Sequence, residues 1–220
     1  MLIAEGLYVR RTTPRLDGAS GPVTGSVPGE GPALRLLVIG ESTVDGVGAA
    51  SHEEALTGQL AHALAGRTGR AVSWLAVGKT GANARVVHDE LLARVAPADL
   101  VVIALGVNDT IELRSAAAFR RDLLRLVVAL RRRLGPVPVH FAGVPPMGRF
   151  PALPQPLRAV FGLRSAALAA AAASLAEVPG VGYVPMPAAL LDPLCFASDR
   201  FHPGPAGYRL WAGQLAEVLA

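Results

Sequence analysis

The chain has 220 residues, of which 51% are hydrophobic, and this length and composition suit one compact domain with a single large buried core. Its formal net charge is +4, yet nearly all of the basic residues are arginines scattered along the chain, and 5% of the residues are aromatic. Because aromatic residues do not interleave with the basic ones, a nucleic-acid partner is not expected. The single cysteine, Cys195, excludes an internal disulfide and mildly favours a reducing compartment.

Membrane insertion and secretion are not expected either. The mean hydropathy is +0.40, but no stretch reaches the roughly 18 to 20 uninterrupted apolar residues that a membrane span needs, and the alanine-rich run after Ser165 comes nearest. The apolar segment 1–7 is short, and Arg10 and Arg11 follow it, which reverses the order of charge in a secretory signal. These features predict a cytoplasmic protein without stable membrane insertion.

Residues 1–33 are rich in Gly, Pro and Thr and lack a periodic pattern, so they are expected to form an irregular arm before a single domain over residues 34–220. Residues 34–39, which are apolar except for Arg35, form a run that ends at a glycine, which is typical of a strand buried on both faces of a sheet. Ser51, with Glu54 three residues later, forms a capping box that predicts the start of a helix.

Strands and helices then alternate to the end of the chain, which is the pattern of βαβ units. Ser115 is expected to cap one long helix, and Gly135 and Pro136 are expected to end it. The alternation predicts an α/β fold, a three-layer α/β/α sandwich around a mostly parallel five-stranded sheet. The further strands are expected near residues 71–77, 100–105, 137–142 and 181–184, and the helices over residues 82–95, 115–134 and 204–219.

Small and polar residues collect directly after three of the predicted strands. They form the segments Gly40-Glu41-Ser42, Gly78-Lys79-Thr80-Gly81 and Gly106-Val107-Asn108-Asp109. In a parallel α/β sheet, ligands bind beyond the carboxyl ends of the strands, where the order of strand connection reverses. The three segments are therefore expected to line one site.

Ser42 is the candidate nucleophile of this site. A serine in the turn after the first strand can present its hydroxyl in the cleft, with its backbone N–H toward a developing oxyanion. The candidate base is His202, since the other four histidines fall within helical or strand patterns and His202 lies in a loop. Asp199 stands three residues before His202, and Pro203 keeps the histidine out of helical dihedral angles, so the carboxylate can reach the distal ring nitrogen.

Two further hydrogen-bond donors complete the predicted oxyanion hole. Gly81 offers a backbone N–H in a loop where the missing side chain permits close approach of a substrate. Asn108 offers a neutral amide N–H, which stabilises negative charge without competing for the proton. Gly78 is the main rival to Gly81 as the backbone donor.

Together these segments resemble the SGNH/GDSL hydrolase superfamily in order and spacing over about residues 34–220. The resemblance implies a flavodoxin-like sandwich and a serine esterase or acylhydrolase, which cleaves carboxylic esters through a Ser-His-Asp acyl-enzyme without a metal. The usual first block reads Gly-Asp-Ser, and Glu41 departs from it, which bears on local hydrogen bonding and subfamily more than on proton transfer. By this resemblance the nucleophile is Ser42, the second- and third-block residues are Gly81 and Asn108, and the last block holds Asp199 and His202.

Alternative functions find less support in the residues. The segment 78–80 reads Gly-Lys-Thr after a strand, as in a P-loop nucleotide-binding protein, but Ser73 stands where that motif needs its first glycine. His52 and Glu53 begin a zinc-binding His-Glu-x-x-His pattern that Leu56 does not complete, so no metal or cofactor is expected. An acyltransferase is a further alternative, because the same acyl-enzyme can pass its acyl group to an alcohol other than water.

An apolar segment with several prolines, residues 145–163, follows a predicted strand and is expected to wall the cleft. Within it, Met147, Phe150 and Leu153 are the candidate residues of an acyl pocket, with ordinary core packing as the alternative. The expected partner is a small-molecule ester with an apolar acyl group.

Overall fold

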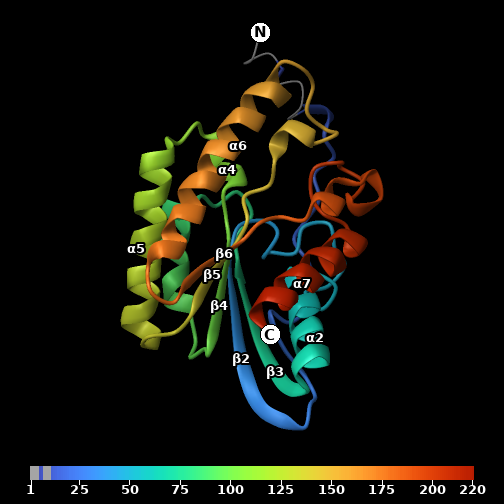
Figure 1. The fold of residues 1–220 in the computed structure, drawn as a ribbon. Coiled ribbons are helices and arrows are strands. Elements are labelled where there is room, and N and C mark those ends of the chain that lie inside the picture. The colour runs from blue at the N-terminus through green and yellow to red at the C-terminus, as the bar shows by residue number, and fades with distance from the viewer. Residues whose placement is uncertain (1–4, 7–10) are drawn as a thin grey trace.

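The computed structural model describes residues 5–6 and 11–220, so residues 1–4 and 7–10 of the predicted arm lie outside the described part. Within the described residues, six strands form one central sheet with helices on both faces (Figure 1), as the predicted α/β sandwich requires. The strands are β1 (Thr24–Val27), β2 (Gly31–Gly40), β3 (Arg70–Gly78), β4 (Leu100–Ala104), β5 (Val139–Ala142) and β6 (Val181–Val184), in the spatial order β1-β3-β2-β4-β5-β6.

The sheet has one strand more than predicted. Strand β1 lies inside the segment that was expected to be irregular, and it pairs antiparallel with β3, with Thr24 opposite Leu75 and Val27 opposite Val72. The other neighbouring strands pair in parallel. A strand of four residues is too short to show a clear alternating pattern, and its hydrogen-bonding partners come from the edge of β3.

The five parallel strands follow the flavodoxin-like order, and the direction of strand connection reverses between β2 and β4. Strand β2 pairs with β3 on one side and with β4 on the other, and its last residue, Gly40, aligns with Gly78 and with Ala104. The three polar segments that follow these strands therefore start at the same edge of the sheet, at the point of reversal.

The helices cover both faces of the sheet. They are α2 (Leu56–Thr68), α3 (Ala84–Val86), α4 (Val107–Ile111), α5 (Ala116–Leu134), α6 (Leu157–Ala173) and α7 (Pro205–Leu219), with short π or 3₁₀ turns at η1 (Val87–Leu91), η2 (Leu92–Arg94), η3 (Met147–Arg149), η4 (Ser174–Glu177), η5 (Ala188–Leu191) and η6 (Pro193–Cys195). Helices α5 and α6 lie on one side of the sheet and α2 and α7 on the other (Figure 1).

Strand β2 contributes to the hydrophobic core on both of its faces. Leu36 and Val38 belong to the cluster that includes residues of α2 and α7, whereas Leu37 and Ile39 belong to the cluster that includes residues of α5 and α6. A strand segment that is covered on both faces is apolar at every position, and this explains the continuous apolar run from Leu36 to Ile39, whereas Arg35 is exposed.

Two of the predicted helices differ from the structure. Ser51 does not cap a helix, because it forms a bridge with Ser20, and α2 begins only at Leu56. The helix expected over residues 82–95 forms over residues 84–94, where α3 continues without a break into the π-helical η1 and the 3₁₀-helical η2. Ser115 does cap α5 as predicted, since its hydroxyl accepts a hydrogen bond from the N–H of Ala118 at 3.2 Å.

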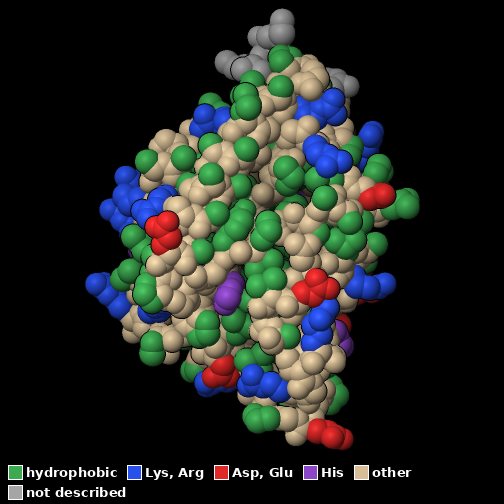
Figure 2. Space-filling model, in the orientation of Figure 1, with side chains coloured by type: hydrophobic (Ala, Val, Ile, Leu, Met, Phe, Trp, Pro, Cys, Tyr) green, Lys and Arg blue, Asp and Glu red, His purple; other side chains and the backbone are tan. Residues whose placement is uncertain are grey.

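The helical stretch Leu157–Glu177, which joins α6 and η4, is long and apolar enough to cross a membrane by length and composition. It has 21 residues and a mean hydropathy of 1.6, although Arg158 and Arg164 interrupt its apolar sequence. Hydrophobic side chains lie along the outer surface of α6 (Figure 2). The stretch also packs against α5 and η3, as helices of globular proteins do, so its composition is weak evidence for a membrane span.

Candidate active site

Ser42 lies in a turn at the end of β2. The carbonyl oxygens of Glu41 and Ser42 accept hydrogen bonds from the N–H groups of Asp45 and Val47, at 3.1 and 3.0 Å, so the chain turns directly after the strand. Tyr208 of α7 holds this turn in place, because its hydroxyl donates to the carbonyl oxygen of Val47 at 2.6 Å. Burial raises the pKa of Tyr208, so its hydroxyl stays a neutral donor.

His202 and Asp199 come from the segment just before α7. The Nε2 atom of His202 lies 3.0 Å from the hydroxyl oxygen of Ser42, and the Nδ1 atom lies 2.6 Å from Oδ2 of Asp199. The positions of Ser42 and His202 differ by 160 in the sequence, so the folded sheet is what brings the two side chains together. In this order an imidazole can take a proton from the serine while the carboxylate fixes its tautomer.

Asp199 is held as an ionised acceptor. Its Oδ1 atom accepts the backbone N–H groups of Phe201 and His202, at 2.9 and 3.0 Å. Burial alone would raise the pKa of Asp199, but the hydrogen bonds from the His202 side chain and from the two N–H groups together hold this pKa below its usual range. Arg200 has a φ of 58°, a left-handed conformation that is strained for a residue with a side chain and folds the segment around the carboxylate.

The segment that follows β3 is tied to the turn after Ser42. The Oδ2 atom of Asp45 accepts the N–H of Thr80 at 3.1 Å and the Thr80 hydroxyl at 2.6 Å. Lys79 forms an ion pair with Glu90. The lysine and threonine of the P-loop-like sequence are thus engaged in contacts within the protein.

The two glycines considered as backbone donors have different surroundings. Gly81 has a φ of 80°, and no atom lies within 4 Å of the place where a Cβ would stand. At Gly78 a Cβ would lie 2.1 Å from the backbone nitrogen of Asp45, so the turn after Ser42 covers this residue. Gly81 therefore leaves room for a ligand to approach, and Gly78 does not.

Asn108 stands near the start of α4, and its side chain is engaged by Glu41. The Nδ2 atom of Asn108 donates to Oε2 of Glu41 at 2.6 Å and to the carbonyl oxygen of Ala82 at 3.1 Å. The Glu41 carboxylate also accepts the N–H groups of Val107 and Asn108, both at 3.0 Å. The Glu41 carboxylate, which follows β2, thus accepts the first N–H groups of α4, which follows β4. A negative charge is favoured at this end of a helix.

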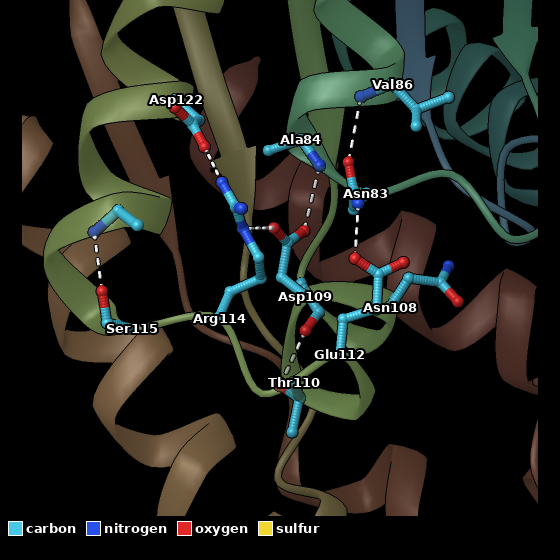
Figure 3. A network of polar contacts seen from close by, with 12 residues as sticks. Asn83, Ala84, Val86, Asn108, Asp109, Thr110, Glu112, Arg114, Ser115 and Asp122 are labelled. Carbon is cyan, nitrogen blue, oxygen red and sulfur yellow. Dashed lines mark hydrogen bonds and ion pairs between the residues drawn. The ribbon is translucent and has the colours of Figure 1, made fainter.

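A second polar network joins α4 to the loop after β3 (Figure 3). Asp109 is completely buried, and its Oδ2 atom accepts the N–H of Ala84 at 3.0 Å. Arg114 lies 3.9 Å from the same carboxylate. Figure 3 shows the Asn108 side chain pointing away from Asp109, so the network holds the first turn of α4 while Asn108 faces elsewhere. Asn83, Glu112 and Asp122 extend the network.

Glu41 is 2% exposed, and its burial raises the pKa of the carboxyl to about 7, with the charge of Asp109 adding to the rise. The hydrogen bonds from Asn108 and Val107 act in the opposite direction without cancelling it.

This pKa predicts a specific dependence of stability on pH. Between the ordinary value of 4.5 and about 7, the folded protein binds more protons at Glu41 than the unfolded chain does, so stability falls as the pH rises through this window. We expect the free energy of unfolding to fall by about 3 kcal/mol more in the wild type than in Glu41→Gln across the window. Urea titrations at several pH values check this, and a parallel fall in both proteins would contradict it.

A small cavity lies beside Ser42 and His202, and both residues line it. Most of its lining is apolar, and three phenylalanines form a large part of it. The rings of Phe196 and Phe201 pack edge-on against Phe150, with centroids 5.7 and 5.1 Å away, and the ring of Phe201 also packs against His202. The cavity thus joins the reactive side chains to an apolar wall.

Of the three residues predicted to form an acyl pocket, one lines the cavity and two do not. Phe150 lines the cavity. Met147 and Leu153 are not among its lining residues, because they are 0% and 3% exposed and pack within the small hydrophobic cluster to which Phe150 also belongs. The N–H of Met147 donates to the hydroxyl of Ser165 at 3.1 Å, which ties this part of the segment to α6.

Several residues that support the site are not singled out by the sequence. Glu41 carries a visible signal, since a charged residue directly after a buried strand needs partners. Asp45 and Tyr208 carry none, because their partners are Thr80 and Val47, which the fold alone brings near. In the part of the chain that the structure describes, no group of three or more His, Cys, Asp or Glu side chains is placed to hold a metal ion.

A doubly wound α/β fold with serine, histidine and aspartate hydrogen-bonded in this order at the strand ends is typical of serine hydrolases. The sequence profile of the GDSL-like lipase/acylhydrolase family matches residues 38–210, and the chain belongs to this family. This places it among the carboxylic ester hydrolases and confirms the resemblance carried by the motifs.

The chain is similar to the GDSL-like esterase Rv1075c of Mycobacterium tuberculosis, with 32% identity over 241 aligned positions that cover 100% of this chain and 76% of the relative. Among solved structures, it is similar to the lipase Lip_vut3 from a goat rumen metagenome, with a TM-score of 0.70, 17% identity and coverage of 84% of this chain and 96% of the other. A carbohydrate acetylesterase family member from Sinorhizobium meliloti has a TM-score of 0.62 at 22% identity, covering 84% of this chain and 97% of its own. At these identities the two structures show the shared fold.

Proposed function

We propose that this protein hydrolyses small-molecule carboxylic esters through an acyl-enzyme formed on Ser42. The observation that carries the proposal is the hydrogen-bonded order of Ser42, His202 and Asp199, at 3.0 and 2.6 Å, beside an apolar cavity. Membership of the GDSL-like lipase/acylhydrolase family supports the same reaction class.

In the proposed reaction, the Ser42 hydroxyl attacks the ester carbonyl carbon, and Nε2 of His202 accepts the hydroxyl proton. The tetrahedral intermediate expels the alcohol, which receives that proton from His202, and the acyl group stays on Ser42. A water molecule then attacks the acyl group, gives its proton to His202, and the acid leaves as the serine takes the proton back. Asp199 keeps its hydrogen bond to Nδ1–H throughout, so the free lone pair of the imidazole faces Ser42.

Negative charge develops on the carbonyl oxygen in both halves of the reaction. We assign its donors as the backbone N–H groups of Ser42 and Gly81 and the side-chain amide of Asn108. Two observations support this assignment. The last residues of β2, β3 and β4 are aligned in the sheet, and the space beside Gly81 is open. Loss of one such donor costs about 2.7 to 4 kcal/mol in other enzymes.

The acyl group is proposed to be apolar, because the cavity beside Ser42 is lined largely by aromatic and aliphatic side chains. Transfer of the acyl group to an added alcohol would use the same intermediate, so product analysis with methanol present measures the balance of transfer and hydrolysis.

A panel of p-nitrophenyl esters from acetate to palmitate tests the proposed function directly. Hydrolysis is expected and should persist in EDTA, because no proposed step uses a metal ion. A serine-directed fluorophosphonate should form an adduct at Ser42, which peptide mass mapping locates. Absence of hydrolysis across the panel, or an adduct at another residue, would overturn the proposal.

Replacing Phe150 by alanine should shift the substrate preference toward longer acyl chains. Phe150 is 5% exposed and forms a wall of the cavity, so its loss lengthens the space available to the acyl group. The ratio of kcat/KM for the octanoate to that for the acetate should rise roughly tenfold or more. The same change should lower the free energy of unfolding by about 3 to 5 kcal/mol.

Phe161→Ala is the matched control for this substitution. Phe161 packs partly buried against the same small hydrophobic cluster, but it is not among the residues that line the cavity. It should reduce stability and leave the octanoate-to-acetate ratio unchanged. An equal change of the ratio in both variants would show that the effect comes from loosened packing and would contradict the acyl pocket.

A further inference from the structure

Three hydrogen-bond donors converge on the carboxylate of Glu41, the residue immediately before Ser42. They are the backbone N–H groups of Val107 and Asn108, both at 3.0 Å, and the Nδ2 atom of Asn108 at 2.6 Å. Two of the three donors belong to Asn108 and bind the same oxygen, Oε2. This oxygen therefore accepts hydrogen bonds from both the backbone and the side chain of Asn108. A carboxylate with accepting oxygens only is suited to such a set of donors.

The hydrogen bonds to Glu41 determine the orientation of the Asn108 side-chain amide. An asparagine side chain can rotate and exchange its oxygen and nitrogen positions, and in the rotated state its carbonyl oxygen would face the Glu41 carboxylate and repel it. Because Oε2 of Glu41 also accepts the backbone N–H of Asn108, it acts as an acceptor here, and this selects the orientation with the NH₂ group toward Glu41. The second N–H of that group then points to the carbonyl oxygen of Ala82, the residue next to Gly81.

We propose that Glu41 is the positioning residue of the oxyanion donor: its carboxylate holds the Asn108 amide so that one N–H stays on Glu41 and the other is directed toward the Gly81–Ala82 backbone. When the tetrahedral intermediate forms, the second N–H leaves the carbonyl oxygen of Ala82 and donates its hydrogen bond to the oxyanion instead. This inference rests on the proposed function, since it assigns the oxyanion to the place between Gly81 and Asn108. It gives a catalytic consequence to the glutamate that replaces the usual aspartate of the first block.

A double-mutant cycle between Glu41 and Asn108 tests the inference. Asn108→Ala should lower kcat by about 100- to 1000-fold with KM nearly unchanged. Glu41→Ala should lower kcat by roughly ten- to a hundredfold, because the donor loses its orientation. In the Asn108→Ala background, Glu41→Ala should cost less than about threefold further, because the donor that it orients is already gone. Glu41→Gln keeps one accepting oxygen and should lose only about threefold to tenfold, a partial rescue.

Losses that multiply in the double variant, or an effect confined to KM, would overturn the inference. If Glu41→Ala does not fold, the cycle is run with Glu41→Gln, whose smaller loss should disappear in the Asn108→Ala background. The two proposals fail in different ways. Activity that survives in Ser42→Ala overturns the proposed function, whereas an inactive Ser42→Ala together with independent losses at Glu41 and Asn108 overturns the inference about Glu41 alone.

Discussion

Replacing Ser42 by alanine should lower kcat by about 10⁴- to 10⁶-fold and leave the fold intact. The hydroxyl removed is the group that faces Nε2 of His202 at 3.0 Å, and the proposed acyl-enzyme cannot form without it. The smaller side chain fits the same buried position, so the free energy of unfolding should change by less than about 1 kcal/mol. Initial rates with a p-nitrophenyl ester and thermal unfolding measure the two effects.

His202→Ala should approach the same loss, and the double variant of Ser42 and His202 should be little worse than either single one, because the two side chains act as a unit. Ser198→Ala is a suitable control, since Ser198 is exposed in the loop just before Asp199. It should keep wild-type turnover. A Ser42→Ala protein with near-normal kcat, or losses that multiply in the double variant, would count against the assigned roles.

Replacing Asp199 by asparagine should lower kcat by about 10⁴-fold, and the structure explains why so small a change has such an effect. The backbone N–H groups of Phe201 and His202 both donate to Oδ1, so the asparagine must keep its oxygen there. Its NH₂ group then faces Nδ1 of His202, which has to act as an acceptor. The ring proton moves to Nε2, and the imidazole can no longer take the proton of Ser42.

Asp192→Asn provides the control for this isosteric change. Asp192 is exposed, and its Oδ1 atom accepts the N–H of Leu194 at 2.9 Å, a local contact that an asparagine oxygen reproduces. Turnover should be unaffected in that variant. If Asp199→Asn keeps near-full activity and an unchanged pH profile of kcat/KM, the carboxylate has no part in orienting the imidazole, and the triad reduces to Ser42 and His202.

The arrangement of strand ends could be predicted because buried parallel strands leave a strong pattern. Each continuous apolar run ends at a glycine or at small polar residues, so the segments around Ser42, Gly81 and Asn108 follow strands in the sequence as they do in the structure. His202 could be found because His62, His88 and His140 fall within regular elements and it does not, whereas the exclusion of His52 used a helix start at Ser51 that the structure does not have. These predictions use local sequence patterns. The residues come close together because the carboxyl ends of parallel strands lie at one edge of the sheet.

The parts that could not be predicted depend on contacts between distant residues. Ser51 has the sequence of a helix cap, but its bridge with Ser20 keeps it out of α2. The first turn of α3 is fixed by Asp109, which accepts the N–H of Ala84 and comes from another strand end. The burial of Met147 and Leu153 depends likewise on packing within one small cluster. The intrinsic helix and strand propensities of a segment do not indicate which distant residues will contact it.

The distance of 160 positions between Ser42 and His202 has a consequence for synthesis of the protein. At about 5 to 20 residues per second, the ribosome adds His202 about 8 to 32 seconds after Ser42. During that interval the nascent chain carries a serine with an ordinary, unreactive hydroxyl. Under the proposed mechanism, the Ser42 hydroxyl becomes reactive only when the segment that carries Asp199 and His202 docks against the sheet.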